Sequence, residues 1–485
     1  MQETDQYMSL SKSLTWMSIA QAVSFILQFG ASAIVAHYLT PGEMGVYGVG
    51  FAIVSVISII QQLSLPAFLI REERLTSHVI ATAFTVNAVL TVVLCLLVLG
   101  ASYAGGLLFT EPGVSRILRA LAWSPLFGIL AFVPSSLLER EGRFRPIAVI
   151  SIITGLVTAG VSIAGALTGQ SYMSLAYGQI SGVAVNCLLM MLSGREHFHL
   201  RPSLTEWRRI ATFSGQMFFV SGLATGAQRL SEISLGKIVN LAALGLYNRA
   251  SGMNNMLWAN VYYVVSRVLL VEIADLHRTR TSLRETYLNS IGALMAIMWP
   301  AFVGLIILAK PVIVYVYGAQ WMPAVPAFVV LGLASILMVP LTLTGEIFAA
   351  TGQLGIRTRI ELIRAAVSLV TFVAACFISL EAAAATRVLD VMLAWWLYRP
   401  HLNVITDTRT RDLLPGLRNG VLLTAFACFP AAAATFFSGY DVLPLPAIGA
   451  SVGLGIGLWF AGLILLDHPL WRQMRMLKSR AALVR

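Results

Sequence analysis

Charged side chains inside long apolar runs are the residues of this chain whose types and spacing suggest chemistry. Arg229 lies three residues before Glu232 in a run that ends near Lys237, and Arg249 follows in the next apolar run. Charges are costly in hydrocarbon and usually face a bundle interior or a water-filled cavity. Because a short turn joins the two runs, Arg229, Lys237 and Arg249 would together suit a ligand that bears phosphate. They are therefore candidate substrate-binding residues.

Each of these charges also has a structural interpretation. Opposite charges three residues apart lie on one helix face and can neutralise each other. Three couples have this spacing: Arg229 with Glu232, Glu361 with Arg364, and Arg387 with Asp390. Lys237 and Arg267 lie near the ends of their runs, where a long side chain can reach the membrane interface. We retain Arg267 as a fourth candidate for substrate binding.

Glu346 is an acid inside an apolar run with no basic residue three or four positions away. A carboxylate within a membrane span can exchange protons and so respond to an ion gradient. Glu346 and Glu232 are therefore candidates for coupling to a proton or sodium ion. The structural alternative for Glu346 is a cross-helix ion pair with Arg357 or Arg364.

Other chemistry has no candidate residues in this sequence. No Walker A sequence and no His-Glu-x-x-His is present, so we expect no ATP hydrolysis, no catalytic residues and no enzyme activity. The cysteines lie in apolar runs without Cys-x-x-Cys spacing, which argues against a disulfide framework, a metal site or a cofactor. They are Cys95, Cys187, Cys376 and Cys428.

The elements that must position these residues are membrane-spanning helices. Of the 485 residues, 58% are hydrophobic and 11% are charged, and the mean hydropathy is +0.80. A soluble domain is about half apolar and a quarter charged, so a secreted enzyme is excluded, as is a nucleic-acid partner despite the net charge of +11. Runs of about 20 apolar residues predict 14 spans: 14–36, 46–68, 79–103, 117–138, 147–167, 174–193, 211–238, 245–271, 286–308, 324–350, 359–379, 382–398, 417–437 and 445–466.

The basic residues predict the orientation of these spans. Cytoplasmic loops retain Lys and Arg, and with a cytoplasmic N-terminus that side holds 24 of the 33 such residues. The opposite side holds three, and the remaining six lie inside spans. We therefore expect a multi-pass protein of the cytoplasmic membrane with both termini in the cytoplasm.

An internal repeat is indicated when the chain is compared with itself at an offset of 200 residues. The matches pair the first span with the seventh: Gln28 with Gln228, Gly45 with Gly245, and Tyr47 with Tyr247. Six spans per copy is an even number, so both copies would insert in the same direction. We predict an all-α integral membrane protein with parallel six-helix lobes over 1–200 and 201–400, followed by two further helices and a basic tail over 401–485.

Four stretches resemble bacterial polysaccharide transporters, the Wzx-type flippases of the multidrug/oligosaccharidyl-lipid/polysaccharide exporter superfamily. They are His37–Tyr47, Leu235–Ile238 followed by Leu244–Ala250, Ser266–Leu270 and Val314–Trp321. In this family Lys237 and Arg249 match motif positions, whereas Arg229 rests on the local argument alone. The end of the first helix often carries Arg in this family, and here it carries His37.

The resemblance implies a V-shaped exporter that moves a polyprenyl-pyrophosphate-linked oligosaccharide across the bacterial inner membrane by gradient-driven alternating access. Such antiport would serve exopolysaccharide or O-antigen (lipopolysaccharide) assembly. Its implied partners are the lipid-linked oligosaccharide, membrane lipid, a proton or sodium ion, and a polysaccharide polymerase as a candidate. The alternatives are a multidrug or lipid II exporter of the same superfamily and a multispanning polymerase or glycosyltransferase, which the short outer loops disfavour.

The charge distribution generates a topological prediction. Reporter fusions within 193–209 and in the C-terminal tail should read cytoplasmic, and fusions near Gly42 and Asp441 should read external, because the basic loops stay in the cytoplasm. Paired phosphatase and fluorescent-protein fusions measure this. A tail that reads external would contradict the 14-span interpretation.

Overall fold

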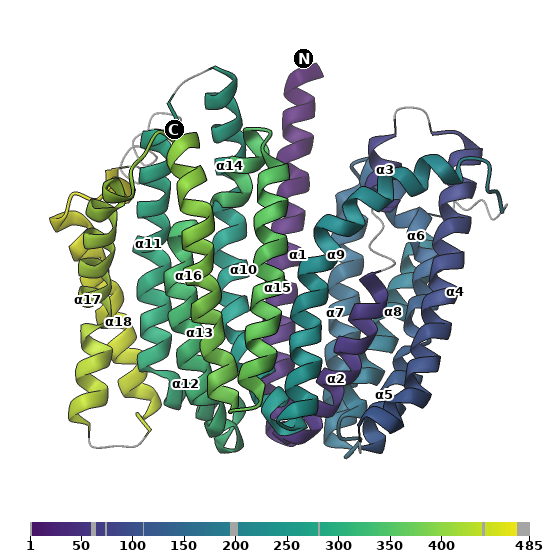
Figure 1. Cartoon of the computed structure of the whole chain (residues 1–485), viewed down its shortest axis with the longest axis horizontal. Helices are drawn as coiled ribbons and strands as arrows, with labels where there is room; N and C mark the ends of the chain where they lie inside the picture. Colours follow the sequence, from purple (N-terminus) through teal and green to yellow (C-terminus); the bar gives the residue numbers. More distant parts are fainter. Residues whose placement is uncertain are drawn as a thin grey trace. The chain divides into compact units, whose positions relative to one another are not determined.

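A computed structural model describes residues 2–59, 65–72, 75–109, 111–194, 202–279, 282–438 and 442–472 (Figure 1). These residues form helices, with no strand among them. This is the expected solution in lipid, where a helix satisfies its own backbone hydrogen bonds. The chain divides into two compact units, Met1–Gly245 and Leu246–Arg485, which are described in turn. Asp441 and the basic tail after 472 lie outside the described residues.

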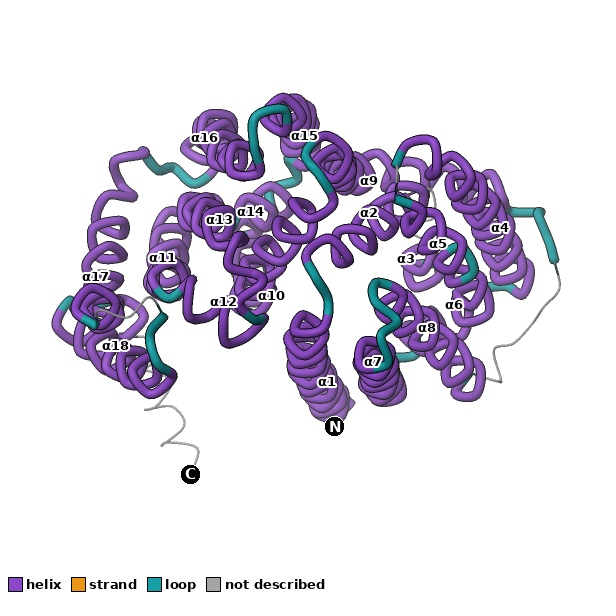
Figure 2. Tube along the Cα trace, turned by 90° about the horizontal axis from the view of Figure 1, so that it is seen from below, coloured by secondary structure: helices purple, strands orange, loops and turns teal. Residues whose placement is uncertain are grey.

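The first unit is a bundle in which helices distant in sequence pack together. Its helix α1 packs against α7, α6 packs against α4 and α8, and α9 packs against α2, α3 and α4 (Figure 2). The bounds are α1 Gln2–Tyr38, α2 Pro41–Ser58, α3 Leu65–Arg71, α4 Ser77–Leu108, α5 Pro112–Leu121, α6 Ser124–Arg140, α7 Phe144–Leu167, α8 Met173–Ser193 and α9 Trp207–Ile238.

The second unit holds a large apolar core among the described residues. Phe302, Phe348 and Tyr398 are fully buried there, on helices α11, α14 and α16. Helix α17 packs between α11 and α18, and α15 packs on α16. The bounds are α10 Leu241–Arg278, α11 Arg284–Ile307, α12 Ala309–Tyr317, α13 Val325–Met338, α14 Thr344–Ala350, α15 Leu354–Cys376, α16 Leu380–Ile405, α17 Leu414–Phe437 and α18 Leu445–Leu465. Helix α10 begins in the first unit and continues through the second.

The predicted spans correspond closely to these helices. Ten helical segments of the described chain are long and apolar enough to cross a membrane. The other four predicted spans coincide with α9, α10, α15 and α16, which are 32, 38, 23 and 26 residues long. A helix of about 20 residues already extends about 30 Å, and these four helices carry the charges discussed above. The total of 14 spans and the division into lobes at 200 and 400 stay predictions.

Two predicted spans are broken within the membrane. The span predicted over 117–138 consists of α5 and α6, and α6 begins with Pro125 in its first turn. The span predicted over 324–350 consists of α13, a 3₁₀ turn at Val339–Leu341 that contains Pro340, and α14. Proline has no backbone N–H to continue the helical ladder. The second break lies just before Glu346 in α14.

The helix boundaries repeat with the offset that the sequence matches indicate. Helix α1 ends at Tyr38 and α2 begins at Pro41, while α9 ends at Ile238 and α10 begins at Leu241, an offset of 200 in both cases. The first turns are capped alike: the Glu43 amide donates to Thr40 Oγ1 at 3.3 Å, and the Ala243 amide donates to Asn240 Oδ1 at 2.7 Å. Such caps satisfy amides that the helix itself leaves without partners.

A second backbone feature repeats after the broken spans. Gly142 follows α6 with φ 70°, and Gly352 follows α14 with φ 72°. In both turns the next residue closes a hydrogen bond, Arg143 to Leu138 at 3.0 Å and Gln353 to Phe348 at 2.9 Å. Glycine adopts this left-handed conformation without steric penalty. These two turns therefore share the same backbone geometry.

Gly45 and Gly245 match because the two helix starts pack against each other. A Cβ atom at Gly45 would lie 1.7 Å from the Leu241 carbonyl oxygen, and one at Gly245 would lie 2.0 Å from the Pro41 carbonyl oxygen. The missing side chain of each glycine thus leaves room for the backbone at the start of the other helix. The contact is reciprocal, which is the reason that both positions carry the same residue type.

Substitution of these glycines should destabilise the fold. We expect Gly45→Ala and Gly245→Ala each to cost about 1–3 kcal/mol, because the added Cβ forces two backbones apart. The apparent melting temperature in detergent should fall by about 1–3 °C for a chain of this length. Gly42→Ala is the matched control, because a Cβ there meets nothing within 4 Å. Equal melting temperatures for all three variants would show that the helix starts separate without penalty.

Candidate functional site

The first unit has an open cavity of about 500 Å³, lined by residues of α2, α4, α6, α8 and α9. Serine, threonine and amide side chains contribute most of its polar surface, together with one cation. We call this space the polar cavity; its lining includes Phe51, Ser55, Ser58, Asn87, Ser124, Ser135, Gln179, Thr225 and Arg229. Polar groups at membrane depth are costly and mark functional sites.

Arg229 is the predicted binding residue that lines the polar cavity. Its Nη1 bonds Glu232 Oε2 at 2.8 Å, which confirms the predicted couple. The Glu232 side chain is only 6% exposed and also accepts a hydrogen bond from Gln228 at 3.3 Å. The Arg229 guanidinium lies 5.2 Å from the centre of the Phe51 ring. The cation is therefore held beside the cavity and is largely neutralised.

Lys237 lies at the exposed end of α9, away from the polar cavity. Its ammonium is 5.6 Å from the centre of the Phe109 ring. It lines a separate space of about 520 Å³ together with Glu111 and Asn240. The interfacial position that the sequence suggested for Lys237 agrees with its exposure.

Arg249 lies in the second unit, between two aromatic rings. Its guanidinium carbon is 4.3 Å from the centre of the Tyr317 ring and 4.7 Å from that of Trp321. The residue is 6% exposed. Cation–π contacts of a desolvated guanidinium are worth about 2 kcal/mol, so Arg249 has a packing role here. Its predicted contact with substrate stays a prediction, and the side chain of Arg267 lies outside the described part of the chain.

Glu346 lies in α14, directly after the break in the tenth predicted span. Tyr262 Oη donates to its Oε1 at 2.6 Å, and its Oε2 has no hydrogen-bond partner in the described structure. The residue is 8% exposed. Neither Arg357 nor Arg364 pairs with it within the described chain, so the ion-pair alternative is not found. A buried carboxylate oxygen without a partner is expected where a proton or cation binds.

The remaining intramembrane charges form a network between α15 and α16. Arg364 bonds Glu361 at 3.0 Å, as the spacing predicted, and also bonds Asp390 at 2.9 Å. The predicted couple of Arg387 with Asp390 is wrong, because Asp390 turns to the neighbouring helix. Arg387 instead donates to Tyr247 Oη at 3.1 Å and to Ser368 Oγ at 2.9 Å. Its guanidinium also stacks on Phe372, with 4.5 Å to the ring centre.

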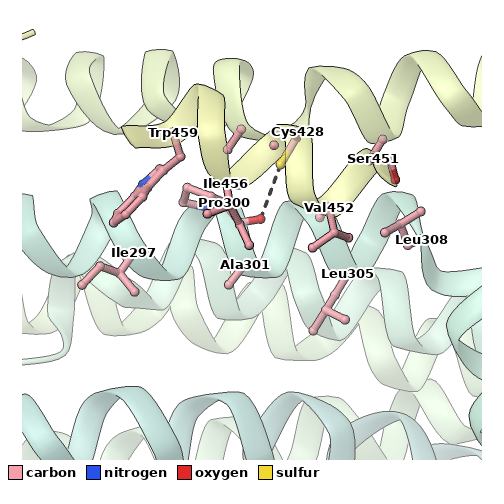
Figure 3. Close-up of a pocket in the computed structure, with 14 residues that line it drawn as sticks. Ile297, Pro300, Ala301, Leu305, Leu308, Cys428, Ser451, Val452, Ile456 and Trp459 are labelled. Atoms are coloured by element: carbon pink, nitrogen blue, oxygen red, sulfur yellow. Dashed lines mark hydrogen bonds between the residues drawn. The ribbon is translucent and has the colours of Figure 1, made fainter. Parts of the chain in front are cut away.

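The second unit contains an apolar pocket of about 380 Å³ between α11, α17 and α18 (Figure 3). Pro300, Leu305, Val452, Ile456 and Trp459 point into it. The Cys428 thiol donates to the Pro300 carbonyl at 3.4 Å at its edge. The lining residues carry no formal charge. This pocket suits hydrocarbon and not a glycan or a phosphate.

The sequence did not single out the uncharged residues of the polar cavity. Asn87, Gln179 and the serines lie one or two per span within apolar runs. Such residues are tolerated in membrane helices, where they bond to their own backbone or to other helices. Their convergence depends on which helices are neighbours. The sequence feature that could have indicated this cavity is the presence of a polar residue at a similar depth in each of several predicted spans.

Comparison with known proteins identifies related chains. Residues 34–326 match the family model described as "Polysaccharide biosynthesis protein". TuaB, a teichuronic acid biosynthesis protein of Bacillus subtilis, is 22% identical over 72% of both chains. WzxC, a lipopolysaccharide biosynthesis protein of Escherichia coli, is 21% identical over 66% of both. ExoT, a succinoglycan biosynthesis transport protein of Rhizobium meliloti, is 22% identical over 68% of this chain and 67% of its own.

Solved structures share the fold. The lipid II flippase MurJ in an inward closed conformation has a TM-score of 0.75 at 14% identity, covering 94% of this chain and 99% of MurJ. An inward-facing multidrug resistance transporter of the MATE family and MOP superfamily has a TM-score of 0.64 at 12% identity, covering 82% of this chain and all of the transporter. At these identities the similarity shows the fold alone.

Proposed function

Because the chain belongs to the polysaccharide biosynthesis protein family, we propose that it flips a polyprenyl-pyrophosphate-linked oligosaccharide across the bacterial inner membrane. The family match over residues 34–326 carries the proposal. It agrees with the resemblance to Wzx-type transporters that the sequence motifs indicated, and with relatives named for teichuronic acid, lipopolysaccharide and succinoglycan biosynthesis. The chain is a multi-pass membrane protein, and its work is transport of a substrate without a catalysed covalent step.

The cavities of each unit support this substrate class. A lipid-linked oligosaccharide combines a hydroxyl-rich glycan, a charged pyrophosphate and a hydrocarbon chain. The polar cavity offers hydroxyls and amides beside Arg229, and the apolar pocket offers a lining suited to hydrocarbon. The relatives are named for glycan biosynthesis, which a multidrug exporter would not explain. The alternative exporters therefore have no separate support.

The transport cycle requires an architecture finer than the described helices establish. We place 14 spans in two parallel lobes, 1–200 and 201–400, with two further helices and a tail over 401–485 and both termini in the cytoplasm. The offset of 200 between the ends of α1 and α9 supports two copies of one unit. Parallel copies in transporters rock against each other to open a site alternately to each side.

An ion gradient supplies the driving force in this proposal. Glu346 is the principal coupling residue, because its buried carboxylate has an oxygen without a partner in the described structure. Glu232 is the second, because its pairing with Arg229 places a carboxylate beside the polar cavity. Arg229, Lys237, Arg249 and Arg267 remain the proposed partners of the pyrophosphate.

The role of Arg229 in substrate binding can be separated from its role in neutralising Glu232. Arg229→Gln alone should lower export of the lipid-linked glycan and also the amount of folded protein, because it leaves a buried carboxylate without its cation. Arg229→Gln combined with Glu232→Gln removes both charges and should restore the amount of protein. If Arg229 also contacts the pyrophosphate, export per inserted protein in the double variant stays reduced by about tenfold, the effect of one lost hydrogen bond to a charged group.

The measurement is surface polysaccharide per unit of membrane-inserted protein in a strain that lacks its own flippase. Lys310→Ala is the control, because Lys310 is exposed near the start of α12. Full export by the double variant would assign Arg229 to neutralisation alone. Absence of export by the wild-type chain in strains with several different glycans would refute the proposed function.

Glu346→Gln should weaken gradient-driven export by about tenfold while the amount of protein stays normal, because the amide keeps the Tyr262 hydrogen bond but binds no proton. Export is measured with and without an uncoupler in inverted vesicles. Glu43→Gln is the matched control, since Glu43 closes the cap of α2 with Thr40 and a glutamine can do the same. Unchanged uncoupler sensitivity in a well-expressed Glu346→Gln variant would leave Glu346 a structural residue.

A further inference from the structure

We infer that the polar cavity of the first unit is a binding subsite for an uncharged sugar ring of the transported glycan. The inference rests on the proposed function and adds to it a place for the sugar among the uncharged residues of this cavity. It follows from the hydrogen-bonding groups, the charge and the size of the cavity, all within one compact unit.

The serine hydroxyls of the cavity are arranged as acceptors. Ser55 donates to the Phe51 carbonyl at 2.7 Å, Ser124 to the Leu121 carbonyl at 2.9 Å, and Ser135 to the Phe132 carbonyl at 2.9 Å. Each hydroxyl proton is thereby engaged with its own helix. The oxygen lone pairs remain available to accept. Sugar hydroxyls are donors that match such oxygens.

Two amides of the cavity can donate in return. The Gln179 carbonyl oxygen accepts from Tyr47 Oη at 2.7 Å, which fixes the amide and leaves its NH₂ group to donate. Asn87 is 7% exposed and lines the cavity. An amide at the wall of a cavity can donate to and accept from a ligand there.

The charge of the cavity favours a neutral ligand. Arg229 is the one formal charge among the described lining residues, and its 2.8 Å bond to Glu232 neutralises it. A pyrophosphate carries several negative charges and would meet no second cation in this lining. A polyol meets donors and acceptors without a charge to compensate. The serine and amide part of the lining therefore suits a sugar ring, and Arg229 is the one lining residue proposed to contact the pyrophosphate.

The dimensions of the cavity also fit a sugar. A volume of about 500 Å³ lies within the range of about 300–1,000 Å³ typical of small-molecule sites. Phe132 and Val183 supply apolar wall that can cover the C–H face of a ring. Gly128 lines the cavity, and a Cβ there would meet nothing within 4 Å. A larger side chain at Gly128 would extend into the space that the ligand needs.

The test uses a cysteine placed in the cavity of the full-length protein. Ser135→Cys is labelled with methyl methanethiosulfonate, a small neutral reagent, in detergent solution; the native cysteines are buried. Glucose, galactose, mannose and N-acetylglucosamine are added separately, with sodium pyrophosphate and glycerol as comparison solutes. At least one of the sugars should slow labelling, by about fivefold at saturation, and neither comparison solute should do so.

Variants in the Ser135→Cys background assign the protection to the cavity. Asn87→Leu and Gln179→Leu should each weaken the protecting sugar by about fivefold, as expected for one lost hydrogen bond, and Gly128→Leu should abolish protection. The matched controls Asn186→Leu and Gly160→Leu make the same changes on α8 and α7 outside the lining and should leave protection intact. Normal melting temperatures for all variants show that they fold.

Several results would overturn the inference. The inference fails if the Ser135→Cys thiol is never labelled, or if none of the four sugars slows its labelling. It also fails if pyrophosphate protects the thiol and the sugars do not, or if a sugar still protects the thiol in the Gly128→Leu variant. In cells, wild-type export together with full export by Gly128→Leu and Asn87→Leu would refute the sugar subsite alone. Failure of wild-type export would instead refute the proposed function, so the two failures are distinguishable.

Discussion

Hydrocarbon provides no partner for a charge or a hydrogen-bonding group, and this constraint governs every polar residue of the chain. The Arg249 guanidinium stacks between two aromatic rings, and Glu232 forms an ion pair with Arg229. Arg364 forms ion pairs with two carboxylates. Removing one member of such a pair leaves the other buried and uncompensated, which is far more destabilising than the pair itself is stabilising. Most intramembrane charges of this chain are therefore committed to the fold before any substrate arrives.

The same constraint makes the exceptions informative. Glu346 keeps a buried oxygen without a partner in the described structure. Because an unsatisfied buried polar group costs about 1–3 kcal/mol, the fold gains no stability from this oxygen. The proposed coupling ion would bind it, and the proposed sugar would bind the amide that Asn87 presents to the polar cavity.

Sequence reasoning predicted the parts of this molecule that depend on local composition. Hydropathy predicted where most helices lie, although it placed the start of α1 twelve residues late and assigned one span, 46–68, to a stretch that holds the end of α2 and part of α3. Three-residue spacing predicted the bonds of Arg229 and Arg364 with Glu232 and Glu361. Residue spacing along one helix gives no information about the neighbouring helix. It therefore did not predict that Asp390 forms its ion pair with Arg364. Averaged hydropathy likewise hides a helix break at a proline. The polar cavity was missed because its serines and amides are uncharged and converge only in three dimensions.

The two halves of the chain share their backbone geometry and differ in their chemistry. Gly45 and Gly245 correspond because each receives the backbone of the other helix start, so neither position can change alone without a steric penalty. Gly142 and Gly352 correspond because both turns need a positive φ. No comparable constraint acts on the walls of a cavity, whose side chains face open space. The first unit accordingly presents hydroxyls and amides in its cavity, whereas the second presents a pocket that is almost wholly apolar. Each lining therefore suits a different part of the proposed substrate, the first the glycan and the second the hydrocarbon.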